Sequence, residues 1–214
     1  MLRRRVAHLR RQSPLDVTGL ADVDAVLISH VHHDHLDRAS LRLLGRDVTV
    51  IVPRGARRLL RRFTDVHELG VGDEIEIRGV RIRATPAQHA GPPRTIRPIP
   101  ALGFLISGSR NVYFAGDTDL FPEMSGLADP LDVALLPVAG WGRRLGPGHL
   151  DPQRAAEALR LLRPRVAVPI HWGTLSPPWR RASIDPPETF RRLAAELAPV
   201  VEVRVLVPGS ATSF

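Results

Sequence analysis

Polar and apolar residues alternate in the middle of the chain, in two segments that a glycine separates. Residues 74–78 and 80–84 place an apolar side chain at every second position on either side of Gly79. A period of two residues is typical of strands with one buried face. Residues 102–107 and 111–115 form a similar pair around another glycine. The pattern therefore predicts two pairs of strands, each joined by a tight turn.

Short continuous apolar runs predict further strands. They are rich in β-branched residues and too short for buried helices, which is typical of strands covered on both faces. The first of them leads directly into a segment rich in histidine. These runs span residues 24–29, 48–52, 132–138, 166–170 and 201–207.

Helix start signals precede two segments in the last third of the chain. Asp151 is a good N-cap before Pro152, which predicts a helix as far as residue 162. Asp185, with two prolines after it, predicts another helix through residue 197.

Two earlier segments also have helical character. One spans residues 38–44 and stops at Gly45, and the other spans residues 55–63 with a solvated arginine face. Strand pairs followed by strand–helix alternation predict a layered α/β fold, with one sheet on another and helices outside. We expect residues 1–214 to form one domain. The arginine face consists of Arg57, Arg58, Arg61 and Arg62.

Composition narrows the chemistry. The chain has no cysteine, which excludes disulfides, thiolate metal sites and thiol nucleophiles and leaves His, Asp and Glu as metal ligands. All 30 basic residues are arginine and the net charge is +8. A GC-rich coding bias explains this excess, and attraction to an anionic substrate or a membrane surface is the alternative. Few aromatic residues and no recognisable module argue against nucleic-acid binding.

No apolar stretch has the length of about 20 residues that a bilayer-spanning helix needs. The charged residues 1–12 are not followed by an apolar run, so they do not resemble a secretory signal. We therefore expect a soluble, cytoplasmic protein. Peripheral membrane contact and homo-oligomerisation stay open.

The segment from Ser29 to Asp37 carries the clearest chemical signal. His30, His32, His33 and His35 are four of the nine histidines, and Asp34 lies among them. Neutral imidazoles and an ionised carboxylate are standard ligands for a divalent metal. On a loop at a strand end, His30 and His32 can face one position while Asp34 and His35 face a neighbouring one. The segment therefore predicts a metal site.

This His-x-His-x-Asp-His spacing resembles the signature of the metallo-β-lactamase fold superfamily. The resemblance implies three more ligands downstream in a fixed order, each after a strand, and His89, Asp117 and His171 match them. It covers about residues 21–208 and implies an αββα four-layer sandwich. The flanking residues are similar to the branch that contains the N-acylphosphatidylethanolamine-hydrolysing phospholipase D and the L-ascorbate-6-phosphate lactonase. They are Pro86–His89, Ala115–Thr118, Gly148–Pro152 and Pro169–Thr174.

The family pattern also assigns roles. It implies one metal on His30, His32 and His89, a second on Asp34, His35 and His171, and Asp117 as a bridge between them. Two cations would yield a hydroxide from a shared water and stabilise charge on a phosphoryl or carbonyl oxygen. Zinc is the first expectation, with manganese and iron as alternatives.

His149 is a further candidate. The corresponding family residue faces the substrate, so we expect a general acid or an oxyanion contact, and a histidine bonded to a backbone carbonyl is the alternative interpretation. Asp34, Asp117 and His149 form the expected catalytic set. His33 is expected to be a spacer within the motif. Substrate selection is expected in residues 90–100 and 140–148, whose candidate contacts are Arg94, Arg97, Trp141, Arg143 and Arg144.

The leading hypothesis is a dinuclear metal-dependent hydrolase that cleaves a phosphodiester in a small or lipid-derived anionic substrate. A lactonase or ester hydrolase of a small phosphorylated substrate is the first alternative, and a non-catalytic metal-binding domain is the second. A nuclease of the same superfamily would predict salt-dependent binding of RNA or DNA.

Relatives usually carry an opening block of strands, which residues 1–11 do not resemble. We therefore expect the fold to lack its first strands, through a misassigned start or a truncation. A sheet without these strands would have an exposed edge. Dimerisation that covers this edge is the lesser alternative.

Overall fold

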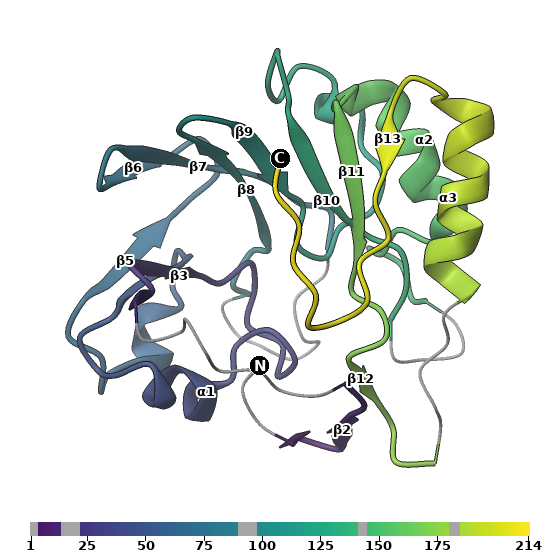
Figure 1. Ribbon diagram of the computed structural model, residues 1–214. Coiled ribbons are helices and arrows are strands. Elements are labelled where there is room, and N and C mark those ends of the chain that lie inside the picture. The colour runs from purple at the N-terminus through teal and green to yellow at the C-terminus, as the bar shows by residue number, and fades with distance from the viewer. Residues whose placement is uncertain (1–3, 14–21, 90–97, 141–144, 180–184) are drawn as a thin grey trace.

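A seven-stranded sheet forms the centre of the fold in the computed structural model, which describes residues 4–13, 22–89, 98–140, 145–179 and 185–214 (Figure 1). Strands β6, β7, β8 and β9 pair with one another in antiparallel fashion, whereas β9, β10, β11 and β13 pair in parallel. In spatial order the strands are β13 (Glu202–Val203), β11 (Val166–Ile170), β10 (Val133–Pro137), β9 (Asn111–Phe114), β8 (Leu102–Ser107), β7 (Val80–Pro86) and β6 (Glu74–Ile77).

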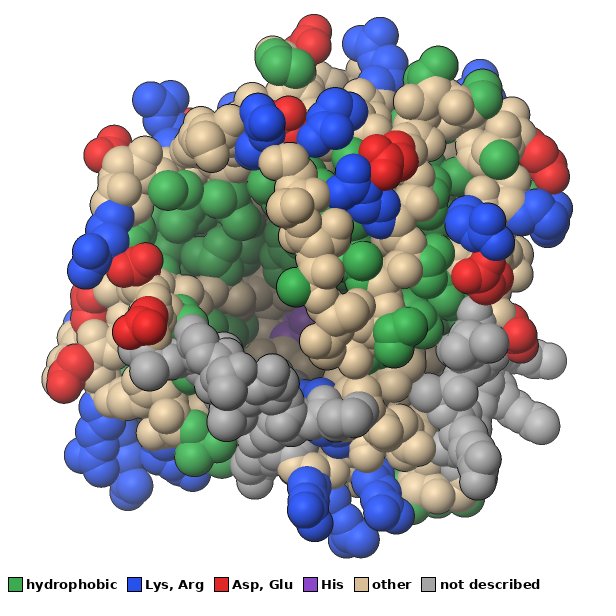
Figure 2. Space-filling view, in the orientation of Figure 1, with side chains coloured by type: hydrophobic (Ala, Val, Ile, Leu, Met, Phe, Trp, Pro, Cys, Tyr) green, Lys and Arg blue, Asp and Glu red, His purple; other side chains and the backbone are tan. Residues whose placement is uncertain are grey.

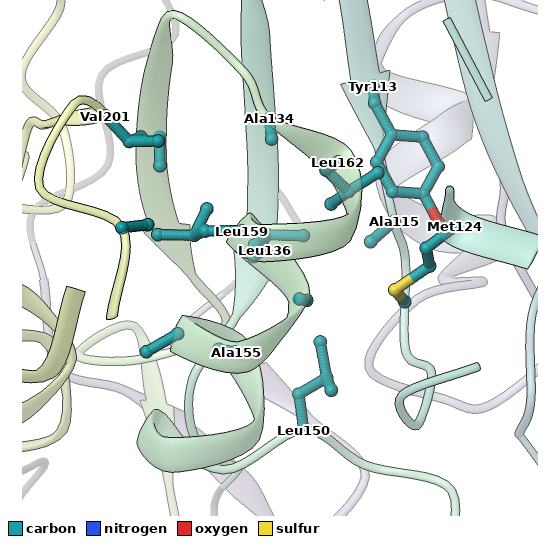
Figure 3. Close-up of a cluster of buried hydrophobic side chains, with 14 of the residues drawn as sticks. Tyr113, Ala115, Met124, Ala134, Leu136, Leu150, Ala155, Leu159, Leu162 and Val201 are labelled. Atoms are coloured by element: carbon teal, nitrogen blue, oxygen red, sulfur yellow. The ribbon is translucent and has the colours of Figure 1, made fainter. Parts of the chain in front are cut away.

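Two helices cover one face of this sheet. They are α2 (Pro152–Leu162) and α3 (Asp185–Leu197), and α2 begins with Asp151 accepting a hydrogen bond from the backbone N–H of Arg154. Their apolar sides pack on residues of β8 to β11 and on η3 (Pro122–Met124). Figure 3 shows part of this core, where Leu159 and Leu162 of α2 lie near Leu136 and Tyr113 of the sheet.

A smaller parallel sheet lies against the other face. It consists of β3 (Ala25–Leu27), β4 (Thr49–Pro53) and β5 (Val66–Leu69). Neighbouring residues of β4 point to opposite sides, so that Ile51 packs toward the large sheet while Val50 and Val52 pack outward. The outward side is covered by α1 (Arg38–Leu43) and by the segment around η2 (Arg57–Leu59).

The layers therefore follow the order helix, sheet, sheet, helix, which confirms the predicted αββα metallo-β-lactamase fold. A third sheet, of β1 (Arg5–Val6), β2 (Leu9–Arg11) and β12 (Leu175–Ser176), lies beside these layers. Val6 and Leu9 pair across it and are buried. None of the described helices is long and apolar enough to cross a membrane.

Two predicted elements are wrong. Residues 55–63 contain only the single 3₁₀ turn of η2, because Glu68 accepts hydrogen bonds from the backbone N–H groups of Gly55 and Arg57 and ties them to β5. The last strand covers only Glu202–Val203, where it pairs with β11, and not residues 201–207. The sequence pattern also missed β1, β2, β5 and β12.

The core between α2 and the large sheet makes a direct prediction. Leu159 is fully buried, so Leu159→Ala should lower the free energy of unfolding by about 2–5 kcal/mol in denaturant titrations. Leu43→Ala is the control, because Leu43 is 65% exposed and its loss should change stability by less than about 0.5 kcal/mol. Equal effects of the two substitutions would contradict the packing described here.

Candidate metal centre

The candidate metal ligands lie on loops that follow strands. His30, Asp34 and the other residues of the histidine-rich segment come after β3, and His89 comes after β7. Asp117 follows β9 and His171 follows β11 directly. The backbone N–H of Leu102 in β8 donates to the carbonyl of Ser29 over 2.8 Å, which fastens the histidine-rich loop to the large sheet. All seven predicted ligands consequently meet in one place.

Two groups of three residues form the ends of this cluster. In the first, Nε2 of His89 lies 3.1 Å from Nδ1 of His32, and His30 completes the group. In the second, Nε2 of His171 lies 3.2 Å from Nε2 of His35 and 3.6 Å from Oδ2 of Asp34. The possible ligand atoms within each group lie within 4.8 Å of one another, which is close enough for a shared metal ion.

Asp117 lies between the two groups. Its Oδ2 is 3.7 Å from Nε2 of His30 and 3.3 Å from Nε2 of His35, and its Oδ1 is 3.4 Å from Nε2 of His171. The residue is only 3% exposed. A single carboxylate thus faces nitrogen atoms of both groups.

His149 faces the same carboxylate. Its Nε2 lies 3.7 Å from Oδ2 of Asp117, while its Nδ1 lies 3.1 Å from the carbonyl oxygen of Gly146. The surroundings of His149 are thus compatible with a substrate-facing role and also with the alternative of a histidine bonded to a backbone carbonyl. One ring nitrogen is bonded to a backbone carbonyl, and the other is turned toward the cluster.

Carbonyl groups and a hydroxyl orient several of the imidazoles. Nδ1 of His89 lies 2.8 Å from the carbonyl of Gly148, and Nδ1 of His171 lies 2.7 Å from that of Ala139. A neutral imidazole that donates its Nδ1–H to such a carbonyl keeps a free lone pair on Nε2. Metal-binding histidines need this arrangement. The Ser29 hydroxyl lies 3.1 Å from Nδ1 of His30 and 3.4 Å from Nδ1 of His35. Sequence reasoning did not select Ser29, although it is adjacent to the motif.

The electrostatics suit cation binding. Burial is the main cause that lowers the pKa of His30, His32 and His89, so these imidazoles are neutral. Burial opposes ionisation of Asp117, but the neighbouring His171 and His35 outweigh it and hold the pKa of that carboxyl well below its usual range. The pKa of Asp34 is also lowered, because its contact with His171 and the charge of His35 outweigh burial.

The donor set fits divalent metal ions. Nε2 of His30 and Oδ1 of Asp117 are buried and have no hydrogen-bond partner among the described residues. Buried polar atoms normally have partners, so two such atoms in the same cluster need an explanation. Imidazole and carboxylate donors suit zinc, manganese and iron. Cations bound within the cluster would satisfy both atoms.

The backbone around the cluster departs from ordinary geometry at Gly116 and His171. Gly116 has φ +62°, and a Cβ there would lie 2.7 Å from Cβ of Ser29, so only glycine fits beside Asp117. His171 has φ +64°, a left-handed conformation that is uncommon for residues with a side chain. Such strain is frequent at functional sites, where the surroundings hold it in place.

The structure does not place the other predicted residues in the cluster. His33 is exposed and belongs to none of the metal-capable groups found among the described residues. The candidate substrate contacts Arg94, Arg97, Trp141, Arg143 and Arg144 lie outside the described residues. Arginines and acidic residues are interspersed over the face shown in Figure 2, which also shows a hollow with hydrophobic walls and a histidine side chain inside it.

Known proteins share both the sequence pattern and the fold. Residues 2–172 match the model of the beta-lactamase superfamily domain. A metal-dependent hydrolase from Methanopyrus kandleri is 34% identical over 202 residues, which cover 88% of this chain and 81% of that protein.

Solved structures give the same result. A metallo hydrolase from the archaeon Ignicoccus hospitalis has a TM-score of 0.70 and 30% identity, and the match covers 89% of this chain and 79% of that chain. The isothiocyanate hydrolase from Delia radicum gut bacteria has a TM-score of 0.71, with 94% of this chain and 80% of that chain covered. Its 22% identity makes it a likeness of fold alone.

Substitution of Gly116 tests the close approach beside Asp117. Gly126→Ala is the matched control, since Gly126 also has a positive φ but a Cβ there would meet nothing within 4 Å. The control should lose about 1–2 kcal/mol of unfolding free energy through backbone strain. Gly116→Ala should lose about 1–3 kcal/mol more, because the new methyl group collides with Ser29. Equal losses in chemical denaturation would refute the steric argument.

A second prediction concerns the proton on His171. Burial disfavours its charged form, but Asp117, Asp34 and the Ala139 carbonyl outweigh burial and raise the pKa to about 9. At about pH 7 a metal ion must therefore displace this proton, and metal affinity should rise with pH until about pH 9.

Calorimetry in buffers of different ionisation enthalpy measures the protons released on metal binding. His171→Gln should release about one proton fewer than the natural chain at about pH 7. Identical proton release by the two proteins would show that His171 is not protonated in the metal-free site.

Proposed function

The chain belongs to the beta-lactamase superfamily, and on that premise we propose that its cluster of histidines and aspartates holds two divalent cations and hydrolyses a phosphodiester. Membership of the family, relatives named as metal-dependent hydrolases and the His/Asp cluster support the broader statement that it is a metal-dependent hydrolase. The metal count, the metal identity and the substrate are the content of the proposal.

The reach of Asp117 is the observation that carries the dinuclear assignment. In the proposed site His30, His32 and His89 would hold one cation, Asp34, His35 and His171 would hold the other, and Asp117 would contact both. Support comes from the Asp117 oxygens, which lie 3.3–3.7 Å from nitrogens of His30, His35 and His171. Zinc suits this nitrogen and oxygen donor set best, with manganese or iron as alternatives.

When bound, such cations would lower the pKa of water and stabilise negative charge on a substrate oxygen. The chain itself then has to hold the substrate and manage protons. Asp117 and Asp34 supply the negative charge that keeps the cations in place. His149 is the proposed general acid, because its Nε2 faces the cluster and its side chain is 25% exposed, so that substrate can reach it.

The choice of a phosphodiester depends on flanking residues. Gln88 beside His89, and the Gly148–Pro152 segment around His149, resemble the phospholipase D side of the family branch. The lactonase side shares the metal ligands, so lactone hydrolysis is the principal competing outcome. The net charge of +8 is consistent with an anionic substrate in either case.

Asp117→Ala tests the proposal. Loss of the bridging carboxylate should lower kcat/KM for bis(p-nitrophenyl) phosphate by more than about a hundredfold. This exceeds the loss of about tenfold to a hundredfold that is typical when only a hydrogen-bond partner of a metal ligand is removed. Glu123→Ala, at an exposed position in η3, should leave turnover unchanged. Turnover of a phosphorylated lactone but not of the phosphodiester would favour the lactonase. Full activity of Asp117→Ala on either substrate would refute the site.

A further inference from the structure

We propose that the ion pair between Arg154 of α2 and Asp119 positions two residues of the site, the proposed metal ligand His89 and the proposed general acid His149. The inference rests on the proposed metal site but concerns residues outside it. Nη1 of Arg154 lies 2.8 Å from Oδ1 and 2.9 Å from Oδ2 of Asp119. We call this pair, with the hydrogen bonds of Asp119, the Arg154–Asp119 clasp.

The Asp119 side of the clasp joins the loops after β9 and β7. The backbone N–H of Asp119 donates to the carbonyl of Gln88 over 2.9 Å. The N–H of Gln88 in turn donates to the Thr118 hydroxyl over 2.9 Å, and that hydroxyl donates to the carbonyl of Asp119. Gln88 directly precedes His89, and Thr118 directly follows Asp117. These bonds therefore fix the backbone beside two of the proposed ligands.

The Arg154 side joins the same loops to the start of α2. The backbone N–H of Arg154 donates to the Asp151 carboxylate that caps the helix, and the side chain of the same residue holds Asp119. Two residues before the cap, His149 enters the site. One arginine therefore links the helix cap to the loop that carries Asp117.

His89 is held between these two sides. Its Nδ1 bonds to the carbonyl of Gly148, which precedes His149 in the chain. The backbone contact here is tight, because a Cβ at Gly148 would lie 3.0 Å from both the Gln88 carbonyl oxygen and Cα of His89. A shift of the start of α2 would consequently move His149 and the Gly148 carbonyl away from His89.

The acidic partner of this pair is mostly buried, whereas the Arg154 side chain is 44% exposed. The Asp119 side chain is 16% exposed and its Oδ1 also accepts a hydrogen bond from the N–H of Leu120 over 2.7 Å. By comparison, the Arg192–Glu196 pair on α3 has both side chains at least 60% exposed. Exposed pairs of that kind contribute little, whereas removing one partner of a more buried pair leaves an uncompensated charge.

The residues that hold each ligand predict which of the two proposed metal positions responds to loss of the clasp. His89 belongs to the group with His30 and His32, whereas His35 and His171 are held by Ser29 and by the Ala139 carbonyl, independently of the clasp. The clasp reaches the position of His35 and His171 only through the shared Asp117. Its loss should therefore weaken the position that contains His89 more than the other position. A residue that only stabilises the fold would weaken both together.

Titration with Co²⁺, followed by its visible d–d absorption, separates the two positions. In Arg154→Gln and Asp119→Asn the affinity of one cobalt should fall about tenfold to a hundredfold, as expected when a partner of a metal ligand is lost. The affinity for the second cobalt should fall much less, because only Asp117 connects that position to the clasp. Arg154→Lys should restore part of the lost affinity, because it retains the positive charge.

Arg192→Gln, which breaks the exposed pair on α3, is the matched control and should leave both affinities unchanged. Unchanged cobalt binding in Arg154→Gln and Asp119→Asn, or an equal loss at both positions, would overturn the inference while leaving the metal site intact. Failure of the natural chain to bind cobalt would instead refute the proposed function and the inference with it.

Discussion

The buried negative charge of Asp117 is the constraint on which the centre depends. A carboxylate that is only 3% exposed persists as an anion only when positive charge or hydrogen-bond donors surround it. Among the imidazoles beside it, burial lowers the pKa of His30 and keeps that ring neutral, whereas His171, whose pKa is raised to about 9, supplies the compensating proton in the metal-free chain. Cations at this point would replace that proton and also satisfy His30, whose Nε2 otherwise has no partner.

The strands of the fold position Asp117, although the residue itself lies on a loop outside them. Strands β9 and β11 are anchored by the apolar core under α2 and α3, and their ends deliver Asp117 and His171 to the cluster. The backbone at that edge is unfavourable on its own, with Gly116 and His171 both at positive φ. A rigid core beneath short loops allows such conformations to persist, and binding energy from ligands can offset them.

Sequence patterns predicted the parts in which local and tertiary preferences agree. Helices α2 and α3 end at residues 162 and 197 as expected, because caps, prolines and apolar spacing indicate the same boundaries. Strands β1 and β12 are two residues long and depend on pairing with β2, so no periodic pattern could reveal them. Residues 55–63 have helical character, yet contacts to Glu68 on β5 limit them to one turn. The proposed ligands could be selected from the histidine-rich motif and the family resemblance, whereas Ser29 and the Arg154–Asp119 clasp depend on three-dimensional contacts.

A crystal structure of the metal-reconstituted protein, with anomalous scattering from the bound metals, tests the central claim most directly. We expect two peaks about 3.5–4 Å apart. One should lie among His30, His32 and His89, the other among Asp34, His35 and His171, and Asp117 should contact both. A site that stays empty after reconstitution, or a single metal that Asp117 does not contact, would contradict the account.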